Sequence, residues 1–207
     1  MPRRVLHDEY FNKAKAEGYV ARSAYKLKQI QEHRPVIRRG MRVLDLGCAP
    51  GAWLQVAGEL VGPTGQVIGL DLTPTLHQFP ANIHTVVGDI YTVDPMALRS
   101  TGLSPGGEPS LFDVVLSDMA PNTSGHGDHE RSIRLCDRVV ELLPDLLKTT
   151  GSLVIKVFEG SEYPRFLKDL REQFTKVKGF KPKASREVSV EMYVIGEGFR
   201  AAPRAGC

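Results

Sequence analysis

The chain is poor in the features that mark exported, membrane-bound or metal-stapled proteins. It has three cysteines in 207 residues and no CxxC pair, which argues against a disulfide framework and a zinc site. No apolar run is long enough to span a bilayer. The first ten residues, MPRRVLHDEY, hold no apolar core and already carry acids. We therefore expect a cytoplasmic protein rather than a secreted or mitochondrial one.

Two common nucleotide-binding motifs are also missing. No GxGxxG opens a helix after a strand, and no glycine-rich loop ends in Gly-Lys-Ser/Thr. The dinucleotide fingerprint and the P-loop are thereby excluded. The chain shows no internal repeat, no low-complexity tract and no strong internal boundary. At this length we expect one domain spanning residues 1–207.

Charge is unevenly distributed along the chain. Residues 1–40 hold 10 Lys/Arg against 4 Asp/Glu, residues 41–159 hold 7 against 14, and residues 160–207 hold 10 against 6. Basic flanks around an acidic middle suit a polyanion held by the two ends. Ordinary variation of surface charge is an equally good explanation of this distribution by itself.

The apolar pattern predicts an α/β fold with a mostly parallel sheet and helices on both faces. Most strands are near-continuous apolar runs, which is typical of strands covered on both sides. The last two strands break the alternation with helices and are expected to form an antiparallel hairpin, with one antiparallel strand at the sheet edge. Strands are predicted at 42–46, 66–70, 83–87, 112–117, 152–158, 175–180 and 188–195, and helices at 7–17, 22–34, 52–60, from about 128 to 148 with a bend at Pro144, and 163–174.

The segment VLDLGCAPGAW, residues 43–53, predicts a cofactor site. A buried strand leads into a glycine–proline turn and then into a helix, the arrangement that places a nucleotide-like ligand at the carboxyl end of a parallel strand. Gly47 and Gly51, on either side of Pro50, let the backbone approach a ligand closely. Trp53, the single tryptophan, is expected to form a wall of the pocket.

Acidic residues follow four predicted strands: Asp45, Asp71, Asp89 and Asp118. One acid after a strand is usually a turn or cap residue, but four beside the glycine turn favour a ligand site. Asp71 is placed for ribose hydroxyls, and Asp89 for an adenine amino group. So many carboxylates repel a pyrophosphate and attract a cation. The sequence thus favours S-adenosyl-L-methionine, which carries a sulfonium, over NAD or ATP.

An ordered set of motifs then resembles a known family. ARSAYKL, DLGCAPGAW, LSDMAPN, LVIKVFEG and KPKASREVSVEMYVIG are similar, nearly end to end, to the FtsJ-like ribose 2′-O-methyltransferases, which include enzymes acting on large-subunit ribosomal RNA. The resemblance implies a Rossmann-like class I S-adenosylmethionine-dependent methyltransferase fold. The family usually has APGGW, and here Ala52 replaces the second glycine.

The same resemblance implies a catalytic set of Lys26, Asp118, Lys156 and Glu191, with Lys156 as proton acceptor and without a metal. It also implies cofactor contacts at Gly51, Trp53, Asp71, Asp89 and Asp118, to which the turn itself adds Asp45, Gly47 and Pro50. A lysine accepts the proton of a ribose hydroxyl only when it is neutral. Desolvation and a second ammonium favour that form, whereas carboxylates oppose it. Asp118 and Glu191 would orient the two amines.

The implied partner is RNA, bound by basic residues of both flanks. We expect a monomer that methylates the ribose of a uridine in 23S ribosomal RNA on the large ribosomal subunit. Transfer RNA as the target, or a non-catalytic ribosome assembly factor, are the alternatives. Tyr25 or Tyr193 could stack on a base, although packing is the commoner role. The predicted phosphate-binding residues are Arg3, Arg4, Lys13, Lys15, Arg22, Lys28, Arg34, Arg38 and Arg39, in the helical extension 1–40, and Lys176, Lys178, Lys181, Lys183 and Arg186.

Overall fold

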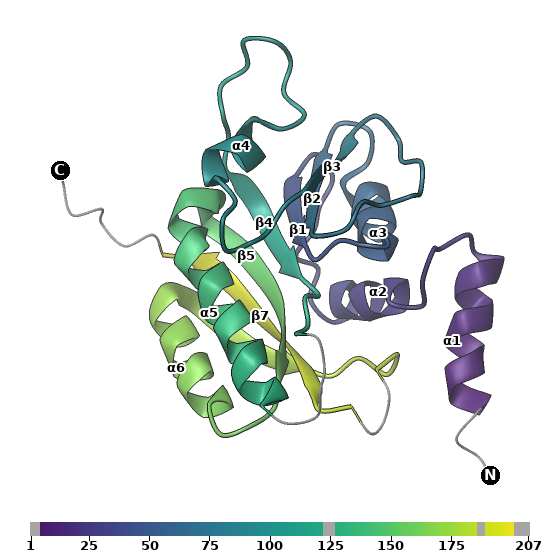
Figure 1. Cartoon of the computed structure of the whole chain (residues 1–207), viewed down its shortest axis with the longest axis vertical. Helices are drawn as coiled ribbons and strands as arrows, with labels where there is room; N and C mark the ends of the chain where they lie inside the picture. The colour runs from purple at the N-terminus through teal and green to yellow at the C-terminus, as the bar shows by residue number, and fades with distance from the viewer. Residues whose placement is uncertain (1–4, 122–126, 186–188, 201–207) are drawn as a thin grey trace.

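A computed structural model describes residues 5–121, 127–185 and 189–200 (Figure 1). After two initial helices, strands and helices alternate along the chain except at the consecutive strand pairs β2–β3 and β6–β7, and the short helix α4 was not predicted. The helices are α1 (Val5–Ala16), α2 (Ala24–His33), α3 (Ala52–Val61), α4 (Pro95–Ser100), α5 (Asp128–Leu146) and α6 (Tyr163–Gln173). The strands are β1 (Arg42–Leu46), β2 (Gln66–Asp71), β3 (Ile83–Val87), β4 (Phe112–Ser117), β5 (Leu147–Phe158), β6 (Phe174–Phe180) and β7 (Glu191–Phe199).

The strands form a seven-stranded sheet in the order β3-β2-β1-β4-β5-β7-β6. Strands β1 to β5 pair in parallel, and β7 is antiparallel to both its neighbours. The predicted hairpin is therefore present, but the antiparallel strand is not at the edge. The connection between β6 and β7 is too short for a parallel crossover, and the hairpin docks on β5 through β7, which leaves β6 outermost.

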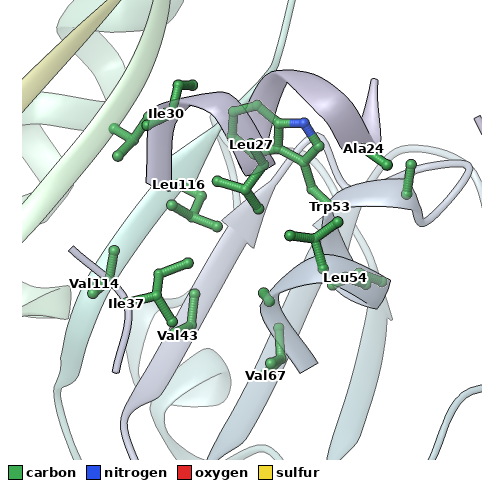
Figure 2. Packing of buried hydrophobic residues seen from close by; sticks show 14 of the residues in the cluster. Ala24, Leu27, Ile30, Ile37, Val43, Trp53, Leu54, Val67, Val114 and Leu116 are labelled. Atoms are coloured by element: carbon green, nitrogen blue, oxygen red, sulfur yellow. The ribbon is translucent and has the colours of Figure 1, made fainter. Parts of the chain in front are cut away.

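Helices cover both faces of the sheet, as predicted. On one face α2 and α3 bury Leu27, Ile30 and Leu54 against Val43 and Val114 (Figure 2). On the other face, residues of α4, α5 and α6 share a second apolar cluster with the opposite side of the strands. Continuous apolar strands are what a sheet covered in this way requires. The two layers leave the strand ends accessible, which is where a ligand binds in such folds.

The junction of α5 and β5 differs from the expectation. The helix ends at Leu146, and β5 begins at Leu147 rather than at residue 152. Leu147 is 1% exposed and pairs with Phe112 of β4. Pairing and burial of this leucine outweigh the local helical pattern, an outcome that the neighbouring residues alone do not reveal.

A buried arginine closes the amino-terminal edge of the sheet. The guanidinium of Arg42 donates hydrogen bonds to the Gln66 side chain and to the backbone oxygens of Ser110 and Thr101. It also lies 4.4 Å from the ring centroid of Phe112. These bonds tie the segment between α4 and β4 to the sheet. The carboxyl edge is thus the open one.

Substituting Arg42→Ala should lower the free energy of unfolding by about 2–3 kcal/mol, because a buried side chain and its bonds to two half-buried carbonyls are lost. Urea denaturation followed by circular dichroism measures this difference. Arg171→Ala, which removes an exposed arginine, is the control and should change the free energy of unfolding by less than about 0.5 kcal/mol. Equal stability of the two variants would contradict the structural role given to Arg42.

Candidate active site

The predicted site residues gather at the carboxyl edge of the central strands. Asp118 follows directly after β4, and Lys156 lies on the neighbouring strand β5, one residue beyond Ile155, the partner of Ser117. Tyr193 of β7 is the register partner of Lys156. Helix α2 contributes Lys26 from the layer above the sheet. Residues far apart in the sequence are thereby brought to one place by strand register.

Lys156 and Asp118 form a buried ion pair. The lysine Nζ lies 3.0 Å from Oδ1 of Asp118, and their side chains are 8% and 18% exposed. The same ammonium donates a hydrogen bond to the backbone oxygen of Asp118. On either side of Lys156, Ile155 and Val157 are fully buried. The lysine is therefore desolvated and held by a single residue rather than extended into solvent.

A second ion pair joins Lys26 to Glu191. Nζ and Oε1 are 2.6 Å apart, with side chains 11% and 13% exposed. Burial acts to raise the pKa of Glu191, but the charge and hydrogen bond of Lys26 outweigh it, and Ser185 and Lys156 add to the lowering. The pKa of this carboxyl is therefore below its ordinary value. All four residues expected to act together lie in one cluster.

Tyr193 is a member of this cluster whose place the sequence did not reveal. Its hydroxyl donates a 2.6 Å hydrogen bond to Oδ1 of Asp118, the oxygen that pairs with Lys156. Its ring lies 5.7 Å from that of Trp53. Burial, with the charges of Asp118 and Glu191, raises its pKa well above the ordinary value, so the phenol stays a donor.

The suggestion that Tyr25 or Tyr193 stacks on an RNA base is wrong. Tyr193 is fully buried and Tyr25 is 5% exposed. Tyr25 packs instead against Tyr10 and Tyr19. Alternation along β7 puts Tyr193 on the same side of the strand as Glu191, and this was the available signal for its position.

The turn after β1 requires its glycines. Gly47 has φ 78° and Gly51 has φ 115°, values that favour residues without a Cβ. A Cβ on Gly47 would lie 2.5 Å from Cγ of Met119, and one on Gly51 would lie 2.5 Å from Cζ of Phe79. The Ala49–Pro50 peptide is cis. The backbone of this glycine cradle, residues 47–51, therefore packs too closely against Met119 and Phe79 to carry side chains at the two glycines.

Asp71 and Asp89 stand at the rim of this cradle and also shape it. Asp71 accepts the backbone N–H of Ala49 at 2.9 Å through Oδ2 and that of Thr73 at 2.9 Å through Oδ1. Asp89 accepts the N–H of Tyr91 at 2.9 Å. Each carboxylate has further lone pairs with which to accept hydrogen bonds from a ligand. Both acids thus have a turn role in addition to the predicted ligand role.

Asp45 is the most unusual acid of the group. It is fully buried, and neither of its oxygens has a hydrogen-bond partner among the described residues. Burial, followed by the charges of Asp118 and Asp71, raises its pKa well above the ordinary value. A buried, unpaired carboxyl beside two other acids is stabilised by a nearby cation. The acids and the glycine cradle therefore fit a cationic nucleoside such as S-adenosylmethionine.

A cleft of about 630 Å³ opens beside the glycine turn. It is lined by Ala49 and Pro50 of the turn, by the segment from Thr73 to His77, and by Val20. Of the predicted cofactor residues, Pro50 is the one that the lining includes. Trp53, expected to wall the pocket, is 3% exposed and donates its indole N–H to the backbone oxygen of Ser23. It therefore joins α3 to the segment before α2.

Known proteins with similar sequences and structures identify the family of this chain. Residues 19–199 match the family model described as FtsJ-like methyltransferase. The chain belongs to the FtsJ-like methyltransferase family. "Ribosomal RNA large subunit methyltransferase E" of Syntrophobacter fumaroxidans is 45% identical over 198 residues, which cover 95% of this chain and 98% of the relative. The protein of that name from Methanothrix thermoacetophila is 46% identical, with 95% and 74% covered.

Solved structures agree with this assignment. A protein described as a ribosomal RNA methyltransferase from Plasmodium falciparum has a TM-score of 0.75 and 25% identity, covering 87% of this chain and 98% of the other. Fibrillarin of Aeropyrum pernix, solved with S-adenosyl-L-methionine, has a TM-score of 0.60 at 18% identity, with 84% and 76% covered, and shows the shared fold.

The resemblance and the Rossmann-like methyltransferase fold expected from the sequence are thus confirmed. This FtsJ-like protein is a methyltransferase, and S-adenosyl-L-methionine is its cofactor. Among the residues that the structure describes, no group of three or more His, Cys, Asp or Glu side chains could hold a metal ion. Within the same residues, no helix is long and apolar enough to cross a membrane.

Substituting Gly51→Ala should weaken binding of S-adenosylmethionine at least about tenfold, because the new Cβ strains a positive-φ position and pushes Phe79 away from the turn. Isothermal titration calorimetry measures the affinity. Gly106→Ala is the matched control, since Gly106 has φ 82° but no neighbour within 4 Å of a Cβ. Equal affinities in the two variants would show that the turn is not the cofactor cradle.

Proposed function

We propose that this enzyme transfers a methyl group to the 2′-hydroxyl of a ribose in large-subunit ribosomal RNA. The observation that carries the proposal is the pair of buried amines, Lys156 and Lys26, each held by a carboxylate beside the glycine cradle. Bound S-adenosylmethionine supplies an electrophilic methyl group on a positively charged sulfur. The residues of the chain then have to bind that group, position the ribose and take up one proton.

We assign the glycine cradle and the acids that follow the strands to binding of the cofactor. The backbone at Gly47, Pro50 and Gly51 approaches it closely, and Asp71 accepts from ribose hydroxyls. Asp89 accepts from the adenine amino group. A cation bound beside the turn would favour the ionised form of Asp45, whose oxygens are buried and have no partner among the described residues. Trp53 supports the turn from beneath through its bond to Ser23.

Lys156 is assigned as the acceptor of the hydroxyl proton. Its amine must be neutral to do this. Oδ1 of Asp118 lies 3.0 Å from the Lys156 Nζ and holds it in place, and the hydroxyl of Tyr193 donates to the same oxygen. Glu191 is already engaged by Lys26. Positioning of the ribose supplies much of the remaining acceleration.

RNA recognition is assigned to the two basic flanks, which meet in the folded chain. Gln29 of α2 accepts the N–H of Ala184 at 3.0 Å, and the His33 ring stacks on Phe180 at 4.4 Å. Helix α2 therefore lies against the β6–β7 connection. The exposed residues of these flanks are Lys13, Lys15, Arg38, Arg39, Lys176, Lys178, Lys181 and Lys183.

Not every predicted basic residue is equally available. Lys28 pairs with Glu17 at 3.2 Å, and Arg34 lies 3.6 Å from Glu197. Arg22 also has an interaction partner within the fold. Arg3, Arg4 and Arg186 lie outside the described residues. The proposal therefore rests on the exposed lysines and on Arg38 and Arg39.

The finer points follow the relatives. Their printed names specify large-subunit ribosomal RNA, which favours that target over transfer RNA. The intact set of buried ion pairs argues against a non-catalytic assembly factor. We propose a uridine of 23S RNA on the assembled subunit as the substrate. We also propose a monomeric, cytoplasmic enzyme of one domain, with residues 1–40 as part of the RNA-binding face.

Substituting Lys156→Ala should reduce methyl transfer at least about 100-fold through loss of the proton acceptor, with cofactor affinity within about twofold of the parent. Transfer of a tritiated methyl group to large subunits, naked ribosomal RNA and transfer RNA measures both rate and target. Lys148→Ala, an exposed lysine at the other end of β5, is the control and should retain full activity. Loss of cofactor binding in Lys156→Ala would refute the assignment.

The double substitution Lys13→Ala with Lys183→Ala should weaken RNA binding and lower the slope of log K against log salt by about 1 to 2, since one phosphate contact is lost on each flank. Filter binding at several salt concentrations gives this slope. Lys168→Ala on α6 alters an exposed lysine that is not one of the predicted phosphate-binding residues, and its slope should match that of the parent. A slope unchanged in the double variant would remove the basic flanks from the interface.

A further inference from the structure

Trp53 attaches the cofactor turn to the segment that carries Lys26. It is the second residue of α3, two residues after Gly51 of the glycine cradle, and it is 3% exposed. Its indole N–H donates a hydrogen bond to the backbone oxygen of Ser23 at 2.9 Å. A buried indole N–H needs an acceptor, and this acceptor lies 30 residues earlier in the chain. The bond therefore joins two separate elements of the site.

The same Ser23 oxygen also accepts the backbone N–H of Lys26, at 3.0 Å. Ser23 is the residue that precedes α2, and its side chain makes no capping hydrogen bond. The first turn of α2 therefore lacks the usual side-chain anchor. The peptide oxygen that the indole holds is the one that closes the turn containing Lys26. Displacing the indole would thus shift the backbone from which the lysine side chain projects.

Trp53 is also connected to the ammonium end of Lys26. The centroids of the Trp53 and Tyr193 rings are 5.7 Å apart, and Nζ of Lys26 lies 5.8 Å from the centroid of the same tyrosine ring. A cation at that distance from an aromatic face is attracted to it. Tyr193 is fully buried and its hydroxyl is bonded to Asp118, so its ring is fixed in place. The indole therefore reaches Lys26 at the backbone through one oxygen and at the amine through one ring.

Apolar packing places the indole against the same turn of α2. Trp53, Ala24 and Leu27 belong to one buried cluster (Figure 2), and both α2 residues are fully buried. Lys26 lies between Ala24 and Leu27 in the sequence. Packing therefore sets the position of the ring relative to this turn, and the hydrogen bond sets the position of the Ser23 oxygen relative to the ring.

We propose that Trp53 is a positioning residue of the active site, whose indole N–H holds the Ser23 oxygen and so directs Lys26 to Glu191. The lysine Nζ lies 2.6 Å from Oε1 of that glutamate. Lysine has a long side chain with many rotamers, and fixing its backbone limits where the amine can lie. One side chain thereby joins the cofactor turn to one of the two buried amines. The effect of Trp53 on the rate rests on the proposed function, whereas its effect on the pair of Lys26 and Glu191 does not.

The single tryptophan of the chain allows the N–H to be removed by itself. Expression in a tryptophan auxotroph supplied with benzothienylalanine replaces Trp53 by a ring of nearly the same shape, in which sulfur stands in place of the N–H. Fluorotryptophan, substituted on the benzene ring, retains the N–H and is the conservative replacement. Trp53→Phe removes the N–H independently of the analogue. These forms separate loss of the hydrogen bond from loss of the ring.

The first measurement reports on the pair of Lys26 and Glu191 in the full chain. Against the opposing effect of burial, the charge and hydrogen bond of Lys26 lower the pKa of Glu191. Loss of the indole N–H should therefore raise that pKa by about 0.5, and fluorotryptophan should restore it. NMR titration of glutamate labelled with ¹³C at the carboxyl carbon measures the change, and the Glu191 signal is identified by its loss in Glu191→Gln. An unchanged pKa in the benzothienylalanine form overturns the proposal.

The second measurement separates an effect on Lys26 from an effect on the cofactor turn. Loss of the indole N–H should lower kcat for methyl transfer about threefold to tenfold, while the Kd for S-adenosylmethionine stays within about twofold. Gln31→Ala is the matched control, because Gln31 donates a 2.7 Å hydrogen bond to the backbone oxygen of Ile37 near the other end of α2. It should change neither the Glu191 titration nor the rate.

The outcomes distinguish this proposal from the proposed function. Weaker binding of S-adenosylmethionine with unchanged kcat would show that the indole N–H serves the cofactor turn alone, and would overturn the positioning role. If the parent protein transfers no methyl group to any RNA, the proposed function fails, while the NMR titration still decides whether Trp53 positions Lys26.

Discussion

The buried ion pair between Lys156 and Asp118 is the constraint on which the site depends. Removing two charges from water is costly, and the pair is tolerated only where geometry and further hydrogen bonds compensate. The register of β4 and β5 supplies that geometry, since Asp118 and Lys156 both lie just beyond the pair Ser117 and Ile155. Tyr193 adds a donor to Asp118 from the other neighbour of β5. The amine of Lys156, the proposed proton acceptor, is thus positioned by the sheet itself.

The second ion pair requires both ends of the chain. Lys26 lies on a helix that precedes the first strand, and Glu191 opens the last strand. Their meeting depends on the docking of α2 on the β6–β7 connection through Gln29. The same contact brings the basic flanks together, so assembly of the active site and of the proposed RNA-binding face is one packing event. The acidic middle of the chain correspondingly forms the cofactor side.

Local signals predicted most of the strands, and the resemblance to a family supplied the four catalytic candidates, whereas long-range pairing decided the rest. The bounds 42–46 and 112–117 agree with the structure because these strands are buried within the sheet, and 83–87 agrees although it forms a partly exposed edge strand. The start of β5 was missed because Leu147 is a strand residue only through its partner Phe112. The position of β7 inside the sheet, and with it the contact of Tyr193 with Asp118, likewise depends on pairing. The unpartnered oxygens of Asp45 become visible only once the neighbouring layers are in place.

The separation of charge explains how one edge of a sheet can serve a cation and a polyanion together. Asp45, Asp71 and Asp118 are close enough for two of them to raise the pKa of the third, and such a cluster excludes phosphates from the glycine turn. The lysines on the flanks attract phosphates but lie outside that turn. Lys156 and Lys26 lie between the acidic cluster and the basic flanks, and each forms an ion pair with its own carboxylate. A ribose hydroxyl can therefore approach this boundary while its phosphates remain on the basic side, which orients the strand before any base is read.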